Sequence, residues 1–192
     1  MYSQKQVVLS LGSNLGNRLE NIKLAIQSIH AEIGTVVKIS PIYETPAWGF
    51  ESNLFLNGVI LIHTLKPAAE ILTLISEIEK QLGRQRMDAD TYQARTIDID
   101  IIYYDTEIIK TDTLVVPHAQ MQNRLFVLMP LKSLEIEWKH PVLNLSVTEL
   151  IENCSDLSEC KILHDIELPL KSIKLDSLNY IAIEGNIGAG KT

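Results

Sequence analysis

Cysteine is scarce in this sequence: Cys154 and Cys160 are the only two among 192 residues. Neither has a histidine or cysteine partner at a spacing typical of a metal site, so a zinc site is not expected. We interpret both as free thiols in a reducing compartment. No apolar run approaches the roughly 18 residues that a membrane-spanning helix needs. Residues 1–6 do not have the pattern of a signal peptide, and we therefore expect a cytoplasmic protein.

Basic residues are also few. Lys and Arg number 17 against 24 Asp and Glu, which gives a net charge of −7. This balance argues against a nucleic-acid-binding surface, because such surfaces have an excess of positive charge. Any polyanion that the protein binds must meet a local basic cluster or a metal ion. A content of 46% hydrophobic and 21% charged residues is typical of one globular domain with a remainder.

The most informative segment is residues 95–100, which read RTIDID. Side chains alternate across a β-strand, so the neighbouring isoleucines should point into a core while Asp98 and Asp100 point together to the other side. Two residues along a strand span roughly 6.6 Å. The two carboxylates can therefore converge on a pair of divalent ions about 3.5–4 Å apart, as in phosphoryl-transfer sites.

A less specific interpretation of this carboxylate pair stays open. Acidic residues are 24 of 192, so pairs two positions apart should arise by chance about three times. The pair could also be a solvated decoration of an edge strand. It stands out because residues 97–104 are otherwise apolar, and unpaired carboxylates are costly on a half-buried surface. A cation is the expected partner.

The pattern of apolar residues predicts an α+β fold. Strands are predicted at residues 6–11, 35–43 and 54–64, followed by the carboxylate strand; helices are predicted from Asn17 to Gly34 and from Pro67 to Gly83. The order β-α-β-β-α-β is that of a ferredoxin-like sandwich, with both helices on one face of an antiparallel sheet and a C-terminal extension. The opposite face should be free.

Two long loops, residues 44–53 and 84–94, should cover that open face and form a site. Four arginines near them, Arg84, Arg86, Arg95 and Arg124, are suited to binding phosphate oxygens, although each could equally be a solvated surface residue. Phe55 and Asn57 should share the open face. An aromatic ring and an amide could stack on and hydrogen-bond a heteroaromatic ring, whereas Phe55 could also be a core residue.

Six ordered blocks resemble one known family. They are GSNLGN at 12–17, YETP at 43–46, FLN at 55–57, GR at 83–84, RTIDID at 95–100, and VPH at 116–118 together with NRLFVLMPL at 123–131. From about residue 6 to about residue 155 the chain resembles the 6-hydroxymethyl-7,8-dihydropterin pyrophosphokinases of folate biosynthesis. Some positions depart from the family pattern: Thr113 and Ala119 stand where an arginine and an aromatic residue are expected near the adenosine and phosphates.

The resemblance implies a set of roles. Asp98 and Asp100 would bind two Mg²⁺ ions that bridge the phosphates of ATP, and with Arg84 and Arg95 they would be the catalytic residues. The ATP side would be lined by Glu79, Arg84, Arg86, Arg95, His118 and Arg124, and the pterin would be held by Thr45, Pro46, Phe55, Asn57 and Phe126. The hydroxymethyl oxygen would attack the β-phosphorus, giving AMP and the pterin diphosphate. The expected partners are these two small molecules, without nucleic acid or membrane.

A second phosphate motif occupies residues 185–192, GNIGAGKT, which fits the P-loop pattern after a strand-like segment at 180–184. The sequence of residues 183–188, IEGNIG, resembles that of deoxynucleoside kinases. We expect a pyrophosphokinase domain at residues 1–165, a linker at 166–178 and the start of a second kinase domain at 179–192, within a longer bifunctional polypeptide. Two alternatives remain: a P-loop nucleoside kinase fragment, and a ferredoxin-like ligand-binding module without catalytic activity.

Overall fold

The computed structural model describes residues 4–84 and 94–163. Its first part follows the order that the sequence predicts: β1 (Lys5–Ser13), α1 (Arg18–Glu32), β2 (Thr35–Ile39), β3 (Tyr43–Thr45), β4 (Phe55–Thr64), α2 (Ala68–Gln81) and β5 (Asp98–Tyr104). The later elements are β6 (Ile109–Lys110), β7 (Val115–Val116), a 3₁₀ turn (Met121–Asn123), α3 (Leu125–Ser133), α4 (Val147–Glu152) and β8 (Lys161–Ile162).

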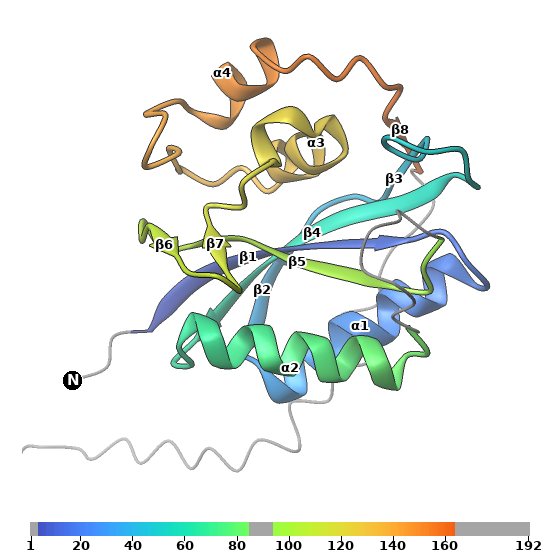
Figure 1. The fold of residues 1–192 in the computed structure, drawn as a ribbon, viewed down its shortest axis with the longest axis horizontal. Helices are drawn as coiled ribbons and strands as arrows, with labels where there is room; N and C mark the ends of the chain where they lie inside the picture. The colour runs from blue at the N-terminus through green and yellow to red at the C-terminus, as the bar shows by residue number, and fades with distance from the viewer. Residues whose placement is uncertain (1–3, 85–93, 164–192) are drawn as a thin grey trace, which may run out of the picture.

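The main sheet has the strand order β5-β1-β4-β3-β8, with β2 pairing with β4 beside β3. All of these pairs are antiparallel. The helices α1 and α2 lie side by side on one face of the sheet (Figure 1). This arrangement is the ferredoxin-like α+β fold that the sequence predicts, with β1 and β4 in the centre.

One predicted strand proves to be two. Residues 35–43 were expected to form a single strand, but β2 ends at Ile39 and β3 begins at Tyr43. Pro41 lies between them and has no N–H to donate to β4. The hydroxyl of Ser40 accepts the backbone N–H of Val59 at 3.0 Å instead. The interruption lets one edge of β4 pair with two short strands in succession.

Helix α1 begins as predicted and ends differently. The side chain of Asn17 accepts the backbone N–H of Glu20 and so caps the first turn. Gly34 follows the helix, but not as a left-handed cap. A Cβ atom at Gly34 would lie 2.5 Å from the carbonyl oxygen of His63, so this position needs glycine because β4 approaches it closely.

The core lies between these two helices and the sheet. Its buried aliphatic side chains come from both layers: Ile22, Ile26, Ile29, Ile71, Ile75 and Ile78 of the helices, and Leu9, Leu11, Ile60, Ile62, Ile99 and Ile101 of the strands. Because successive strand residues face opposite sides, the same strands present a different set of side chains to the other face.

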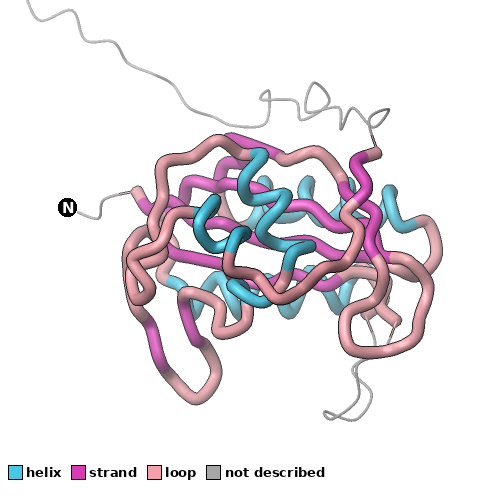
Figure 2. The backbone as a smooth tube through the Cα atoms, turned by 90° about the horizontal axis from the view of Figure 1, so that it is seen from above, coloured by secondary structure: helices cyan, strands magenta, loops and turns pink. Residues whose placement is uncertain are grey.

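That other face was expected to be free, and this expectation is wrong for part of it. Helix α3 packs on β3 and β4, and α4 packs on α3. Figure 1 shows both helices on the side of the sheet opposite α1 and α2, and Figure 2 shows them from above, across the strands. The apolar run of residues 125–131 explains the cover, because it buries Val127, Leu128 and Leu131. No helix in the described ranges has the length and apolar character to cross a membrane.

Candidate active site

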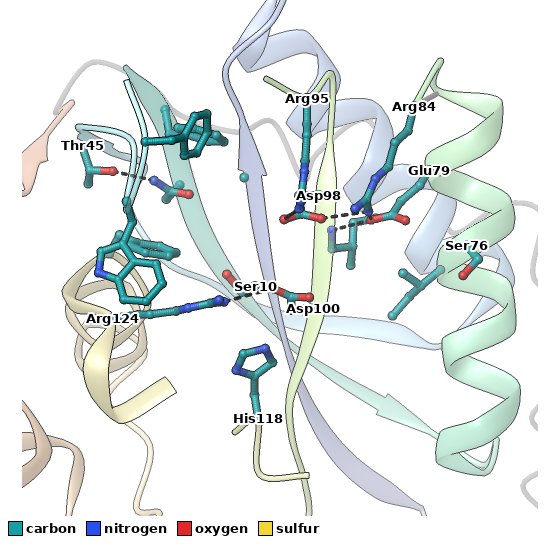
Figure 3. Close-up of a pocket in the computed structure, with 18 of the residues that line it drawn as sticks. Ser10, Thr45, Ser76, Glu79, Arg84, Arg95, Asp98, Asp100, His118 and Arg124 are labelled. Carbon is teal, nitrogen blue, oxygen red and sulfur yellow. Dashed lines mark hydrogen bonds and ion pairs between the residues drawn. The ribbon is translucent and has the colours of Figure 1, made fainter. Parts of the chain in front are cut away.

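A cavity of about 560 Å³ opens beside α3, where β1, β4 and β5 remain uncovered. It brings together every predicted site residue that the structure describes: Thr45, Pro46, Phe55, Asn57, Glu79, Arg84, Arg95, Asp98, Asp100, His118, Arg124 and Phe126. In Figure 3, the side chains of Arg84, Arg95 and Arg124 point toward Asp98 and Asp100. Arg86 lies outside the described residues, as do the linker and the P-loop motif.

The carboxylate pair stands on the cavity side of β5. The alternation predicted for residues 97–101 is confirmed, since the isoleucines are buried while Asp98 and Asp100 are half-buried. In the sheet, Asp98 lies opposite Gly12 and Asp100 lies opposite Ser10. These two small residues leave the space above β1 open, so both carboxylates face the cavity.

Three arginines surround the two aspartates. Nη1 of Arg84 lies 2.8 Å from Oδ1 of Asp98, and Nη1 of Arg95 lies 2.5 Å from its Oδ2. Nη1 of Arg124 lies 3.6 Å from Oδ2 of Asp100 (Figure 3). The cationic groups thus meet the carboxylates from different parts of the chain: the segment after α2, the segment before β5, and the residue preceding α3.

The buried carboxylate of Glu79 in α2 binds to this cluster. Its side chain is 3% exposed, and Oε1 accepts the backbone N–H of Ile99 at 2.8 Å as well as a hydrogen bond from Arg84. Burial raises the pKa of Glu79, while the Arg84 guanidinium opposes that rise. Since its acceptor atom is engaged by the protein itself, Glu79 supports the strand and Arg84.

The electrostatics of Asp100 differ from those of an exposed carboxyl. Burial in the concave wall, and then repulsion from Asp98, raise the pKa of Asp100 to about 7, although Arg124 acts in the opposite direction. Two close carboxylates in one half-buried site are costly to ionise together. A divalent cation between them would remove this cost.

His118 lies close to Arg124 and Asp100, in a segment that follows the cis peptide bond between Val116 and Pro117. Its backbone N–H donates to the carbonyl of Ile102 at 2.9 Å, which fixes the segment against β5. Its Nδ1 accepts the backbone N–H of Gln120 at 3.2 Å. Burial and the Arg124 charge lower the pKa of His118 to about 4. The ring is therefore neutral near pH 7, with its hydrogen on Nε2.

The other half of the cavity is flat and aromatic. Asn57 is buried, and its Nδ2 donates to Oγ1 of Thr45 at 2.8 Å, which fixes the orientation of the amide. The guanidinium carbon of Arg124 lies 5.2 Å from the ring centre of Trp48 and 5.7 Å from that of Phe126. A planar cation already lies over these aromatic faces, so the geometry suits a planar ligand.

Sequence reasoning missed several residues of the cavity wall, among them Ser10, Gly12, Trp48, Phe50 and Ser76. The strand pattern could have found the first two, since they alternate with buried leucines in β1. Trp48 and Phe50 lie in the loop predicted to cover the site. Phe50 meets Phe55 edge-on with 6.3 Å between ring centres. Ser76 lies on α2, in no motif that the sequence analysis singled out.

A second groove adjoins the cavity between α2 and the β6–β7 hairpin, and it shares Leu72 and Ser76 with it. Its walls are mostly small or apolar, and they include Thr113, Leu114 and Ile109. Thr113 therefore lies in the groove next to the charged cluster. A ligand with a charged part and an apolar part could extend across both spaces.

The donor set fits magnesium. Among residues 4–84 and 94–163, no three histidine, cysteine or carboxylate side chains gather in a way that could enclose a metal ion. Mg²⁺ seldom needs such a cage, because it is commonly held by one or two carboxylates together with substrate phosphates and water. Asp98 and Asp100, which point to the same space, provide that kind of site.

A carboxylate pair, a ring of arginines and a pocket for a planar group on a ferredoxin-like sheet define a phosphoryl-transfer enzyme. The chain belongs to the 7,8-dihydro-6-hydroxymethylpterin-pyrophosphokinase (HPPK) family, whose model matches residues 8–136. It therefore has the ATP-using pyrophosphokinase activity of folate biosynthesis, EC 2.7.6.3.

Individual relatives agree with this assignment. The chain is 39% identical over 138 residues to the 2-amino-4-hydroxy-6-hydroxymethyldihydropteridine pyrophosphokinase of Porphyromonas gingivalis, covering 70% of this chain and 93% of that protein. It is 40% identical over 137 residues to the enzyme of that name from Aquifex aeolicus, covering 71% and 84%. The fold resembles that of the wild-type HPPK-DHPS of Plasmodium falciparum in a crystal structure with SDX-DHP, with a TM-score of 0.64 at 16% identity. That match covers 79% of this chain and 44% of the solved chain.

Proposed function

We propose that this cavity binds ATP and 6-hydroxymethyl-7,8-dihydropterin side by side and transfers the pyrophosphoryl group between them. The hydroxymethyl oxygen attacks the β-phosphorus in line, the bond between the α- and β-phosphoryl groups breaks, and AMP leaves. The observation that carries this proposal is that Asp98 and Asp100 share one open face of the sheet with Asn57. Metal ligands and the site for a planar ring are thus neighbours.

Asp98 and Asp100 are the proposed ligands of two Mg²⁺ ions. Bound there, the ions would neutralise negative charge on the phosphate oxygens of ATP. Arg84 and Arg95 pair with Asp98. With metal on the carboxylates, these guanidinium groups would be available to the phosphate oxygens of ATP, to which each can donate two parallel hydrogen bonds. Arg86 is proposed to join them.

His118 and Arg124 act on the same phosphate chain. The neutral imidazole offers Nε2–H as a donor without adding a full charge, because its Nδ1 is occupied by Gln120. Arg124 can exchange its contact with Asp100 for a phosphate oxygen. The base of ATP is proposed to lie in the adjoining groove, next to Leu72 and Thr113. Positioning and electrostatics, rather than covalent catalysis, then lower the barrier.

The pterin is proposed to stack between Phe55 and Phe126, with Thr45 and Pro46 at its edge. Asn57 is proposed to hydrogen-bond the amide-like edge of the ring. Its Nδ2 donates to Thr45, and its carboxamide oxygen remains available to accept from the ring. A fixed amide discriminates against ring systems that lack the complementary edge, because a buried polar group would then be unpaired.

The decisive experiment supplies the purified protein with ATP, Mg²⁺ and the dihydropterin and measures the nucleotide released. Stoichiometric AMP is expected, and release of ADP alone would contradict transfer from the β-phosphorus. A ligand-binding module without catalytic activity would release neither, and its ligand response would not change on substitution of Asp98 or Asp100.

The P-loop motif at residues 185–192 suggests a further, separate activity. The family model ends at residue 136, so it leaves this motif untouched. We propose that this motif belongs to a deoxynucleoside kinase domain. Lys191→Ala should leave AMP formation unchanged, and phosphorylation of a deoxynucleoside that is lost in this variant would support the second domain.

A further inference from the structure

The segment after α4 makes a contact that reaches the edge of the active site. In this segment, Oδ2 of Asp156 accepts the backbone N–H of Leu125, the first residue of α3, at 3.0 Å. The two neighbours of Leu125 in the chain are Arg124 and Phe126, and both line the cavity. A residue far along the chain thus binds the backbone between two site residues.

Helix α3 has no cap of its own at this end. Arg124 occupies the position before the helix, and its side chain makes no capping hydrogen bond. The first N–H groups of a helix lack partners within the helix and need an acceptor. Asp156 provides one from outside the helix, and its negative charge also suits the positive end of the helix dipole.

Asp156 is itself held in place. Its other oxygen, Oδ1, accepts the backbone N–H of Ser158 at 3.0 Å and the hydroxyl of Ser158 at 2.5 Å. Beyond this turn, β8 pairs with β3, which carries Thr45. Figure 1 shows the segment running from α4 to β8 at the edge of the sheet. Both ends of the segment are therefore attached to elements that line the cavity.

We propose that Asp156 is a positioning residue for the reaction: it fixes the start of α3 so that Arg124 and Phe126 face the cavity together. The inference rests on the proposed roles of these two residues. It also extends the functional unit beyond residue 136, where the family model ends, as far as β8. Small displacements of positioning groups are costly in enzymes, because the reacting atoms must be held in a narrow geometry.

The test compares Asp156→Ala with Asp156→Asn, which keeps an oxygen that can accept the Leu125 N–H. Steady-state AMP formation is measured with the dihydropterin varied at saturating ATP, and pterin affinity is measured by calorimetric titration. Asp156→Ala should raise KM for the pterin and lower kcat/KM by about tenfold. Asp156→Asn keeps one oxygen for Leu125 but loses the oxygen that Ser158 uses, so it should recover part of the loss in both.

Two controls separate positioning from general stability and from charge. Val147→Ala shortens a buried side chain of α4, so it should lower Tm, and it removes neither partner of the hydrogen bond between Asp156 and Leu125. Glu159→Ala removes one exposed negative charge from the same segment. Neither variant should change KM for the pterin.

The inference is overturned if Asp156→Ala has the kcat/KM of the original protein, if Asp156→Asn is as impaired as Asp156→Ala, or if Val147→Ala raises KM to the same extent. Arg124→Ala and Phe126→Ala test the underlying roles independently. Should these two variants keep full kcat/KM, the proposed roles fail, whatever the Asp156 variants do.

Discussion

Glu79 holds the strand that carries both aspartates, because its Oε1 accepts the backbone N–H of Ile99 at 2.8 Å. Ile99 lies between Asp98 and Asp100, so this single hydrogen bond from α2 fixes the part of β5 from which both carboxylates project. The same oxygen accepts a hydrogen bond from Nη1 of Arg84. The buried carboxylate therefore joins a helix, a strand and a loop at the site.

Removal of this carboxylate should cost stability. We expect Glu79→Ala to lower the free energy of unfolding by about 1–3 kcal/mol, because the Ile99 N–H and the Arg84 guanidinium lose a buried acceptor. Glu79→Gln should cost less, since it keeps an oxygen for Ile99. Denaturant titration measures both. Glu77→Ala, two residues away on the exposed side of α2, is the matched control; equal losses at the two positions would contradict this explanation.

Substitution of either aspartate should strongly reduce activity while the protein stays folded. Asp98→Asn and Asp100→Asn are each expected to reduce AMP formation by about 1,000-fold or more, because charge on the phosphate oxygens is no longer neutralised. The far-UV circular dichroism spectrum without metal should stay close to that of the original protein. Glu32→Gln, an exposed change of the same kind, should keep full activity. Substantial activity in Asp100→Asn would exclude it as a required metal ligand.

Magnesium binding should depend on pH through Asp100. The pKa of this carboxyl is raised from 3.8 to about 7, so protons compete with the metal for it below pH 7. Apparent Mg²⁺ affinity, measured by titration calorimetry with a non-hydrolysable ATP analogue, should increase from pH 5.5 to pH 7.5 and then level off. An affinity that does not vary across this range would contradict the prediction.

The same shift has a consequence for stability without metal. Between pH 4 and pH 7 the folded protein holds a proton on Asp100 that the unfolded chain has released, so stability falls as pH rises through this window. Asp100→Asn removes this contribution. The Tm of Asp100→Asn minus the Tm of the original protein should therefore increase as pH rises from 5 to 8. A difference that stays constant over this range would contradict the prediction.

Gly12→Ala should weaken pterin binding, because the added methyl group would collide with the side chain of Asn57. An added Cβ would lie 2.9 Å from Oδ1 of Asn57, and therefore either Asn57 or β1 must shift. We expect KM for the dihydropterin to rise about tenfold, with little change in KM for ATP. Gly16→Ala is an instructive contrast, because that glycine has open space around it but a positive φ of 65°. It should lower Tm and leave KM unchanged; the opposite pattern would refute this account of Gly12.

Much of the fold and site could be predicted because the relevant signals are local. Alternation along residues 97–101 assigned the isoleucines to the core and the aspartates to the opposite face. Asn17 marked the start of α1 by its capping chemistry, and the two helical patterns among four predicted strands indicated the ferredoxin-like order. Ordered motifs then suggested the family, which the family model and relatives at about 40% identity confirm.

Other features depend on contacts between distant segments, which only the tertiary structure decides. The sequence by itself determined which residue types alternate, cap and turn, because those preferences act over a few positions. It did not reveal that α3 covers part of the expected open face, that Gly12 lies beneath Asn57, or that Asp156 caps a helix 31 residues before it. These relationships arise from register and packing across the sheet, where many weak interactions are satisfied together.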